Sequence, residues 1–370
     1  MNMMTGTRDF VKAEYDDGSL GSKAFFVLFL VGMLTVLPLF GTSKALSATA
    51  GQTPVYNWKL HSFMPPVDDI YVRSLHKLVK MIDEATKGQV KLTLYPGGAI
   101  VKGPDLLAAC RDKVIEMAYA DPGYWRGTVP VSAVEGGLPL SYQDRWEALS
   151  LLEDYGLAEL CRKEYAKHNV HLLGHNNCAG GGHGVLSKRP VRTLADLKRM
   201  KIRSFGANLE LLDKMGATAM SIPLAEAYLA LATGTVEGCH TGWLPMYNMK
   251  LYEVCKYGML PPTIGDSIHH ILVNMDAWKA LPDDLKSIIT LTHRDWSFWH
   301  ARYYTPNYDI IVMKKLEEKG VTFITLPEAD QANILKIAIG IWDKLAAGDR
   351  AGAEGVKILK DYYSKIGRTK

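Results

Sequence analysis

The sequence predicts an α/β protein of two lobes with a cleft between them. Its composition is that of a globular chain, with 48% hydrophobic and 22% charged residues among 370. Strand patterns alternate with helical patterns from residue 55 to residue 120, and a second alternating set begins near residue 180. Such alternation is typical of open sheets covered by helices. A cleft between two such lobes is a preferred place for a small ligand.

The first set has the order strand, helix, strand, helix, strand. Residues 67–85 carry apolar side chains at helical spacing, and residues 89–95 alternate in polarity before a Pro-Gly-Gly turn. A long helix is expected over 145–168. The other elements expected in this set are strands at 55–62, 89–95, 114–120 and 170–174 and helices at 67–85 and 105–111.

The second set follows the glycine turn at 180–182. Its expected strands cover 184–187, 201–204, 218–222, 268–274 and 321–326, and its expected helices cover 194–197, 208–215, 223–231, 282–320 and 329–364. We therefore expect lobe 1 to comprise 55–180 and 269–308, lobe 2 to comprise 181–268 and 309–336, and 337–370 to form C-terminal helices that pack on the lobes.

The N-terminus has the pattern of a secretory signal peptide over residues 1–50. Ala24 to Ser43 carry no charge, Lys23 precedes this run, and Ala48-Thr49-Ala50 follows it as a cleavage site. The mature protein is then expected in the periplasm. An uncleaved membrane anchor is the alternative, because the run nearly reaches the ~20 residues of a spanning helix and four acidic residues precede it.

Charge and cysteine content exclude several classes of protein. The formal net charge of +4 is small, and no basic run is interleaved with aromatic residues, so we expect no nucleic-acid partner. The five cysteines form no CxxC pair and no metal-finger spacing. Their odd number leaves one thiol unpaired within the chain, and the spacing does not select a disulfide pair.

Motifs for catalysis or for a cofactor are missing from the sequence. We find no G-x-S-x-G, no H-E-x-x-H, no Walker loop and no G-x-G-x-x-G that opens a helix after a strand. His269 and His270 are adjacent on an expected strand, so they point to opposite faces and cannot hold one metal ion from there. We therefore expect no catalytic residue, no cofactor and no metal ion.

Residues 187–257 carry the most specific motifs. This segment resembles the DctP-type solute-binding proteins of tripartite ATP-independent periplasmic (TRAP) transporters, and the resemblance extends over nearly all of residues 55–365. The matching residues are Lys188-Arg189-Pro190, Asp196-Leu197-Lys198, Lys201-Ile202-Arg203, Gly216-Ala217, Glu226, Tyr228, Gly234, Val236-Glu237-Gly238, Lys250, Tyr252-Glu253-Val254 and Lys256-Tyr257.

The resemblance implies a two-lobe periplasmic-binding-protein fold with a long helix that spans both lobes. It implies a binding protein, not an enzyme, that captures an organic anion, either a carboxylate or a sulfonate. The expected partners are that anion and the small and large membrane subunits of a TRAP permease, and the expected state is a monomer.

Arg203 is the central expected ligand residue. It matches the arginine of the family's K-I-R motif, which binds the ligand carboxylate. Its position in the expected fold agrees with this role. Arg203 ends a strand that precedes a helix, so it lies at the carboxyl edge of the sheet, where α/β proteins bind ligands. A guanidinium grips a carboxylate through two parallel hydrogen bonds. The alternative is a surface arginine in an ion pair.

Eight further residues are expected at the ligand site. His183 lies where relatives carry a second arginine, and its protonation would help it bind an anion. Packing is the alternative role for Trp243, burial on the strand is the alternative for His183, and loop capping is the alternative for Asp121. These candidates are Phe63, Asp121 and Tyr124 in lobe 1, and His183, Phe205, His240, Thr241 and Trp243 in lobe 2.

One subgroup of the family binds 2-oxo acids through a metal ion held by an adjacent Glu-Trp pair. Here His240-Thr241 occupies that region. Two other functions remain open on the sequence: a histidine-rich periplasmic enzyme on the same scaffold, and a membrane-anchored anion sensor that keeps its N-terminal apolar segment.

Overall fold

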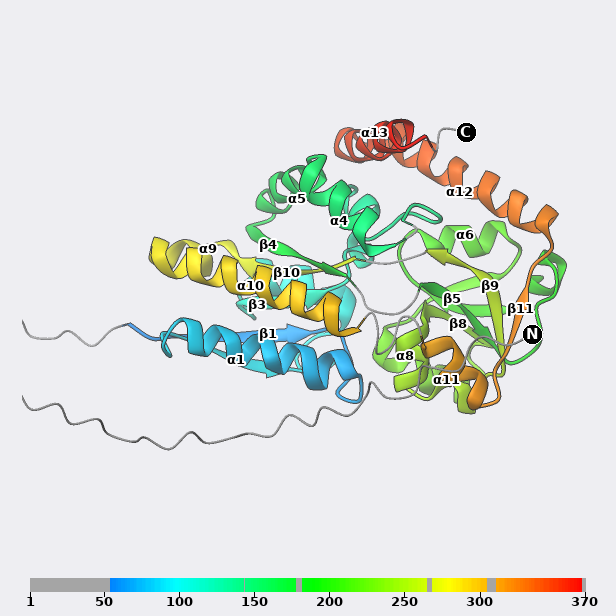
Figure 1. The fold of residues 1–370 in the computed structure, drawn as a ribbon, viewed down its shortest axis with the longest axis horizontal. Helices are drawn as coiled ribbons and strands as arrows, with labels where there is room; N and C mark the ends of the chain where they lie inside the picture. The colour runs from blue at the N-terminus through cyan, green and yellow to red at the C-terminus, as the bar shows by residue number, and fades with distance from the viewer. Residues whose placement is uncertain (1–53, 143, 178–181, 265–267, 305–310, 368–370) are drawn as a thin grey trace, which may run out of the picture. The chain divides into compact units, whose positions relative to one another are not determined.

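The computed structural model describes residues 54–142, 144–177, 182–264, 268–304 and 311–367. The expected signal peptide, Cys178 and the glycines at 180 and 181 lie outside these residues. Two sheets, each covered by helices, account for the described chain (Figure 1). The expected α/β class is therefore confirmed. No helix within the described ranges has both the length and the apolar character to cross a membrane.

The first sheet has the strand order β2-β1-β3-β10-β4. Strands β1, β2 and β3 are parallel, and β10 runs antiparallel between β3 and β4. We call this sheet and the helices packed on it lobe 1. Its strands are β1 (Tyr56–Ser62), β2 (Val90–Tyr95), β3 (Met117–Ala120), β4 (Val170–Asn177) and β10 (Ile268–Asn274).

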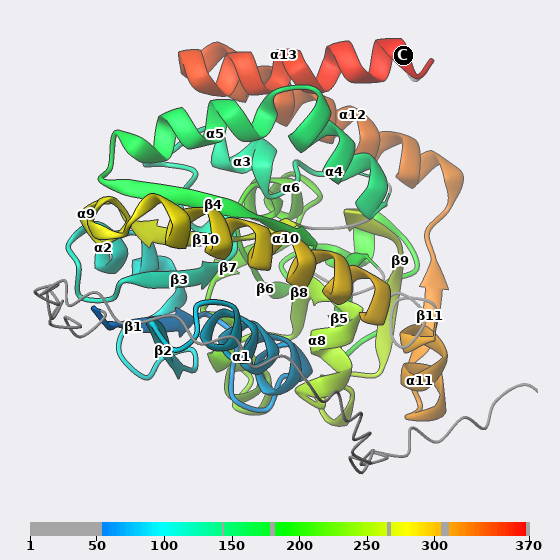
Figure 2. The same ribbon diagram turned by 60° about the vertical axis from the view of Figure 1, so that its left-hand side comes forward.

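Helices cover both faces of the first sheet. Helix α1 packs on β2, and α10 packs on β4 and on α1 (Figure 2). The helices of lobe 1 are η1 (Ile70–Leu75), α1 (His76–Ala85), η2 (Gly103–Asp105), α2 (Leu106–Arg111), η3 (Pro122–Trp125), α3 (Ser132–Glu135), α4 (Arg145–Asp154), α5 (Leu157–Ala166), α9 (Met275–Ala280) and α10 (Asp283–Tyr304).

The second sheet has the strand order β11-β9-β5-β8-β6-β7. Strand β5 is antiparallel to both of its neighbours, β8 and β9, whereas β6 is parallel to β7 and β8. We call this sheet and its helices lobe 2. Its strands are β5 (His183–Ser187), β6 (Lys201–Ser204), β7 (Thr218–Ser221), β8 (Gly238–Gly242), β9 (Tyr257–Ile264) and β11 (Thr322–Thr325).

The second sheet is covered by shorter helices, and the chain ends in two long ones. These elements are η4 (Leu194–Leu197), α6 (Asn208–Lys214), η5 (Leu224–Glu226), α7 (Ala227–Ala232), α8 (Trp243–Asn248), η6 (Leu251–Glu253), α11 (Val312–Glu318), α12 (Glu328–Gly348) and α13 (Arg350–Lys365).

Helix α12 is the long helix that contacts both lobes. It packs on α6 of lobe 2, and Trp342 donates from Nε1 to the carbonyl of Pro139 in lobe 1 at 3.0 Å. The expected end of lobe 2 at residue 336 falls inside this helix and does not coincide with the end of an element. The division of the chain at residue 336 therefore stays a proposal. Asp349 then caps α13 by accepting from the backbone of Ala351 and Gly352.

Three expected elements differ from the structure. The helix expected over 145–168 breaks into α4 and α5 at Gly156, whose φ of +86° interrupts helical geometry. The helix expected over 282–320 is described as α10 up to Tyr304 and as α11 from Val312, with Ile311 in a turn, and residues 305–310 lie outside the described residues. Strand β9 was not expected at all, because Pro261 and Pro262 argue against a paired strand.

The cysteines that the structure describes are buried and free of disulfides: Cys110, Cys161, Cys239 and Cys255. Cys110 and Cys161 belong to the hydrophobic core and so fill apolar positions.

Candidate functional site

A small cavity lies where side chains of the two lobes meet. Lobe 1 contributes residues that follow β1 and β3, and lobe 2 contributes residues at the ends of β6 and β8, as expected for the carboxyl edge of an α/β sheet. The lining residues are Phe63, Met64, Asp121, Tyr124, His183, Arg203, Phe205, Leu224, Thr241, Pro245 and His269.

The cavity volume is about 10 Å³. This is about the room that one water molecule needs. The two lobes are therefore closed on each other, and a ligand enters only when they part.

Arg203 is the buried cation of this cavity. Only 1% of its surface is exposed. Its Nε donates to the carbonyl of Ile222 at 2.8 Å, and its Nη1 donates to the carbonyl of His240 at 2.9 Å. These bonds use two of its five N–H donors and fix the plane of the guanidinium. The ring of Phe205 lies 5.3 Å from the guanidinium carbon.

No carboxylate of the described chain forms an ion pair with Arg203. The Asp121 carboxyl faces the same cavity but lies beyond ion-pair distance, so it offsets only part of the cost of burying this charge. The structure therefore provides a fixed positive charge that an anion in the cavity would neutralise.

Asp121 faces the same cavity from the end of β3. Its Oδ1 accepts from the backbone N–H of Gly123 at 2.7 Å, which caps η3, and its Oδ2 lies 3.8 Å from Nε2 of His269. Burial raises the pKa of Asp121 to about 7, although the Gly123 N–H and Arg203 act in the opposite direction. Asp121 therefore both caps the loop and offers the cavity a carboxyl that titrates near neutral pH.

The histidines of the cavity are neutral. Burial, reinforced by Arg203, lowers the pKa of His183 to about 3. Burial also lowers the pKa of His269 well below its usual value. The lowered pKa opposes the protonation that we expected to help His183 hold an anion. Arg203 is the positive charge among the lining residues.

Thr241 and Phe205 line the cavity as expected, whereas His240 and Trp243 do not. The His240 ring is buried and bonds Oγ of Ser204 at 3.1 Å and Oγ1 of Thr263 at 2.7 Å. Its contribution to the site is its carbonyl, which orients Arg203.

Trp243 is fully buried away from the cavity. It begins α8, which turns its ring against the backbone of Gly184 and edge-on to Phe323, with 5.2 Å between ring centroids. A Cβ on Gly184 would collide with the indole, so this glycine is required for the packing. Trp243 is a core residue of lobe 2.

Comparison with known proteins agrees with this arrangement. The family described as bacterial extracellular solute-binding protein, family 7 (DctP) matches residues 61–349. The chain belongs to the DctP family. Members of this family are substrate-binding proteins that act with TRAP membrane permeases, and the family is extracytoplasmic.

Relatives of this DctP-family protein are 23–28% identical to it over the residues that align. A monocarboxylate 2-oxoacid-binding periplasmic protein of Nostoc sp. is 24% identical over 88% of this chain and 89% of its own. Two solved TRAP-type binding proteins have the same fold. The one from Chromohalobacter salexigens, with bound (S)-(+)-2-amino-1-propanol, has a TM-score of 0.77 at 20% identity over 85% of this chain and 98% of its own. A receptor for pyroglutamic acid from Bordetella pertussis has a TM-score of 0.76 at 16% identity, and the match covers 84% of this chain and 100% of the receptor.

Four lining residues were not expected from the sequence: Met64, Leu224, Pro245 and His269. His269 and His270 do alternate across β10 as expected, so one ring faces the cavity and the other faces away. The alternation alone does not show which of the two faces the cavity, because that depends on the placement of lobe 2.

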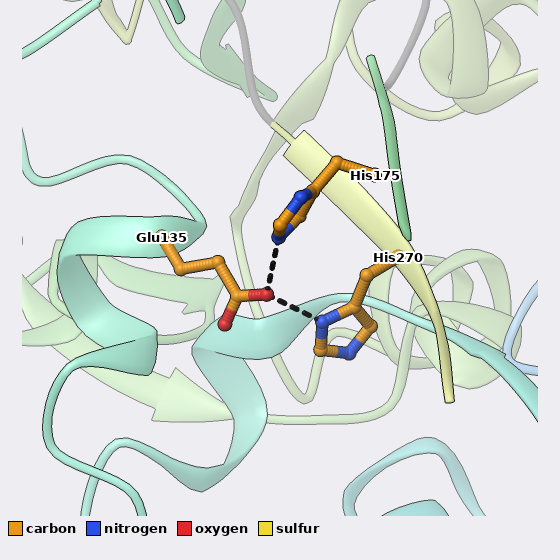
Figure 3. A group of neighbouring side chains, drawn as sticks. All are labelled: Glu135, His175 and His270. Carbon is orange, nitrogen blue, oxygen red and sulfur yellow. Dashed lines mark hydrogen bonds and ion pairs between the residues drawn. The ribbon is translucent and has the colours of Figure 1, made fainter. Parts of the chain in front are cut away.

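Behind the cavity, Glu135, His175 and His270 form a second polar group, the Glu135 cluster (Figure 3). Nε2 of His175 and Nδ1 of His270 lie 2.9 and 2.7 Å from the same oxygen, Oε1 of Glu135. Burial alone would raise the pKa of Glu135, but the two imidazoles lower it to about 2. The cluster lies entirely in lobe 1, and its members do not line the cavity.

Proposed function

We propose that this DctP-family protein is the exported receptor of a TRAP transporter and that it captures a small organic anion at Arg203. The observation that supports this best is the buried guanidinium, which two carbonyls hold at a cavity that both lobes line, with no carboxylate of the described chain within ion-pair distance. A carboxylate or sulfonate would satisfy its remaining donors through charge-assisted hydrogen bonds.

The other lining residues favour a compact ligand with an apolar or aromatic body. Rings and aliphatic side chains make up most of the wall, and the histidines in it are neutral. A heavily hydroxylated sugar acid would leave many hydroxyl groups without partners there. Asp121 would accept from one donor group of the ligand. The name of the Nostoc relative, a monocarboxylate 2-oxoacid-binding protein, supports the same ligand class.

Capture would proceed by closure of the two lobes around the anion. The closed arrangement carries ion pairs between the lobes, of which Lys102–Glu226 is the shortest at 2.8 Å, and Arg126–Glu210 measures 3.9 Å. Closure removes water from around Arg203 and so strengthens its bond to the anion. The closed form would then deliver the ligand to the small and large permease subunits, with the protein acting as a monomer.

A ligand screen tests the proposal. Purified protein is unfolded and refolded to remove bound ligand, and thermal unfolding is then measured with lactate, 2-oxobutyrate, pyroglutamate, benzoate and isethionate. A ligand at a hundredfold excess over its dissociation constant adds about 2.7 kcal/mol of stability, which raises the midpoint by several degrees.

Arg203→Ala is expected to abolish the shift of the active ligand, with a loss of at least about thirtyfold in affinity, since breaking a buried charged contact costs about 2–5 kcal/mol or more. Arg192→Ala, which removes an exposed arginine of the same lobe, is the matched control and should keep the shift. An equal shift in Arg203→Ala and the wild type contradicts the proposal.

Export is tested separately. We propose that residues 1–50 are removed and that the mature chain starts near Gly51 in the periplasm. N-terminal sequencing of the exported protein tests this. A mature chain that still contains Ala24 to Ser43 would instead support the anchored sensor.

A further inference from the structure

The Glu135 cluster brings two histidines and a glutamate from three separate elements to one point. His175 lies on β4 and His270 on β10, and the antiparallel register pairs these two residues directly. Paired residues project from the same face of a sheet, so both rings reach the carboxylate of Glu135 at the end of α3 (Figure 3). The three side chains are fully buried, and their nearest donor atoms lie within 4.8 Å of one another.

We propose that Glu135, His175 and His270 bind one divalent transition-metal ion, with zinc as the best match, at a site separate from the anion cavity. Two imidazole nitrogens and one carboxylate oxygen are a typical donor set for such ions. The ligands of a tetrahedral zinc ion, with bonds of about 2.0–2.1 Å, lie roughly 3.3 Å apart. The present N···O distances of 2.7 and 2.9 Å would widen by about half an ångström, and the two nitrogens, which lie within 4.8 Å of each other, would approach by up to about 1.5 Å.

The surroundings hold these side chains in the orientation that a metal ion needs. The Tyr165 hydroxyl donates to Oε2 of Glu135 at 2.7 Å and accepts from Nε1 of Trp125 at 2.9 Å. The Trp125 ring stacks on His270 with 5.5 Å between centroids. Oriented partners of this kind fix metal-binding side chains and tune their affinity.

A groove in lobe 1 lies next to His175, whose side chain itself is fully buried. This groove of about 340 Å³ is lined by His175 and by Glu153, whose Oε1 lies 3.9 Å from Nδ1 of His175. Glu153 is 45% exposed. It is placed to orient the ring as an outer carboxylate. Arg162 and Arg294 line the same groove, so the groove has no excess of negative charge. On binding, each ring would carry its N–H on the other nitrogen, Nδ1 of His175 and Nε2 of His270, so that the nitrogen facing Oε1 could bind the ion.

Metal binding to untagged, EDTA-treated protein tests this proposal. We expect one zinc ion per chain by elemental analysis after dialysis, a rise in the thermal midpoint with zinc but not with magnesium, and visible d–d absorption of tetrahedral symmetry when cobalt is used as the probe. His175→Gln and His270→Gln should each weaken zinc binding at least tenfold, and Glu135→Gln should weaken it while keeping the shape of the side chain.

His171→Gln is the matched control, because this histidine also lies on β4 but stacks on Trp278 outside the cluster. It should leave zinc binding unchanged, and so should Arg203→Ala, which separates this site from the anion cavity. Wild-type protein that binds no zinc at equimolar concentration overturns the proposal. So does equal zinc binding by the wild type and by both cluster histidine variants, provided that circular dichroism shows the variants folded.

Discussion

Asp121 makes the folded protein sensitive to pH in a way that can be calculated. The pKa of its carboxyl is about 7 in the closed structure, against a usual value of 3.8, and burial is the main cause. The folded state therefore holds this proton more tightly than the unfolded state does. This tighter proton binding adds to the free energy of unfolding; the contribution is complete below about pH 4 and is lost as the pH rises to about 7. A shift of about three units corresponds to roughly 4 kcal/mol.

Asp121→Asn removes the ionisation and keeps the Oδ1 acceptor that bonds the Gly123 N–H. The free energy of unfolding of the variant should match that of the wild type near pH 4 and exceed it by up to about 4 kcal/mol at pH 8. Urea unfolding of ligand-free protein, followed by tryptophan fluorescence between pH 4 and 8, measures this difference. Asp154→Asn, at an exposed carboxylate, is the control and should show no such trend.

A difference between variant and wild type that stays constant over this pH range would refute the reasoning. It would mean that the Asp121 carboxyl is solvated in the free protein, as in a state with the lobes apart. The same substitution should weaken the binding of ligands that offer a donor group to Asp121, which would make Asp121 a position where binding is favoured at the expense of stability.

Three further outcomes follow from the structure. Because Lys102 and Glu226 are exposed, Lys102→Ala should weaken ligand binding by less than about fivefold in calorimetry, as expected for a pair worth at most ~1 kcal/mol; a hundredfold loss would show a buried contact. Trp243→Ala should lower the free energy of unfolding by about 3–5 kcal/mol, and a small loss in urea unfolding would contradict its core position. Since the pKa of His183 is about 3, this residue does not titrate between pH 5 and 8, so the pH profile of ligand affinity over this range should have the same shape in the wild type and in His183→Gln.

The positions of the site residues could be predicted from the sequence where strand geometry determines them. Phe63, Asp121 and Arg203 all lie at or just beyond strand ends, and such ends gather at one edge of a sheet. Thr241 and Phe205 were likewise expected and line the cavity.

Trp243 could not be placed in this way. A continued strand would put it on the same face as Thr241, but the chain turns into α8 at that residue and carries the ring into the core.

The Glu135 cluster could not be predicted from the sequence either. Its hydrogen bonds join residues 40 and 135 positions apart. Only the pairing of β4 with β10 brings the two histidines together, whereas the sequence drew attention to the adjacent pair His269-His270.

The most direct test of the central claim is a crystal structure of the mature protein closed on its ligand. We expect the acidic group of the ligand to accept two hydrogen bonds from the Arg203 guanidinium, at the 2.7–2.9 Å typical of charge-assisted bonds, while Ile222 and His240 keep their carbonyl contacts. A ligand whose acidic group lies elsewhere, with Arg203 bonded only to those two carbonyls, would contradict the account.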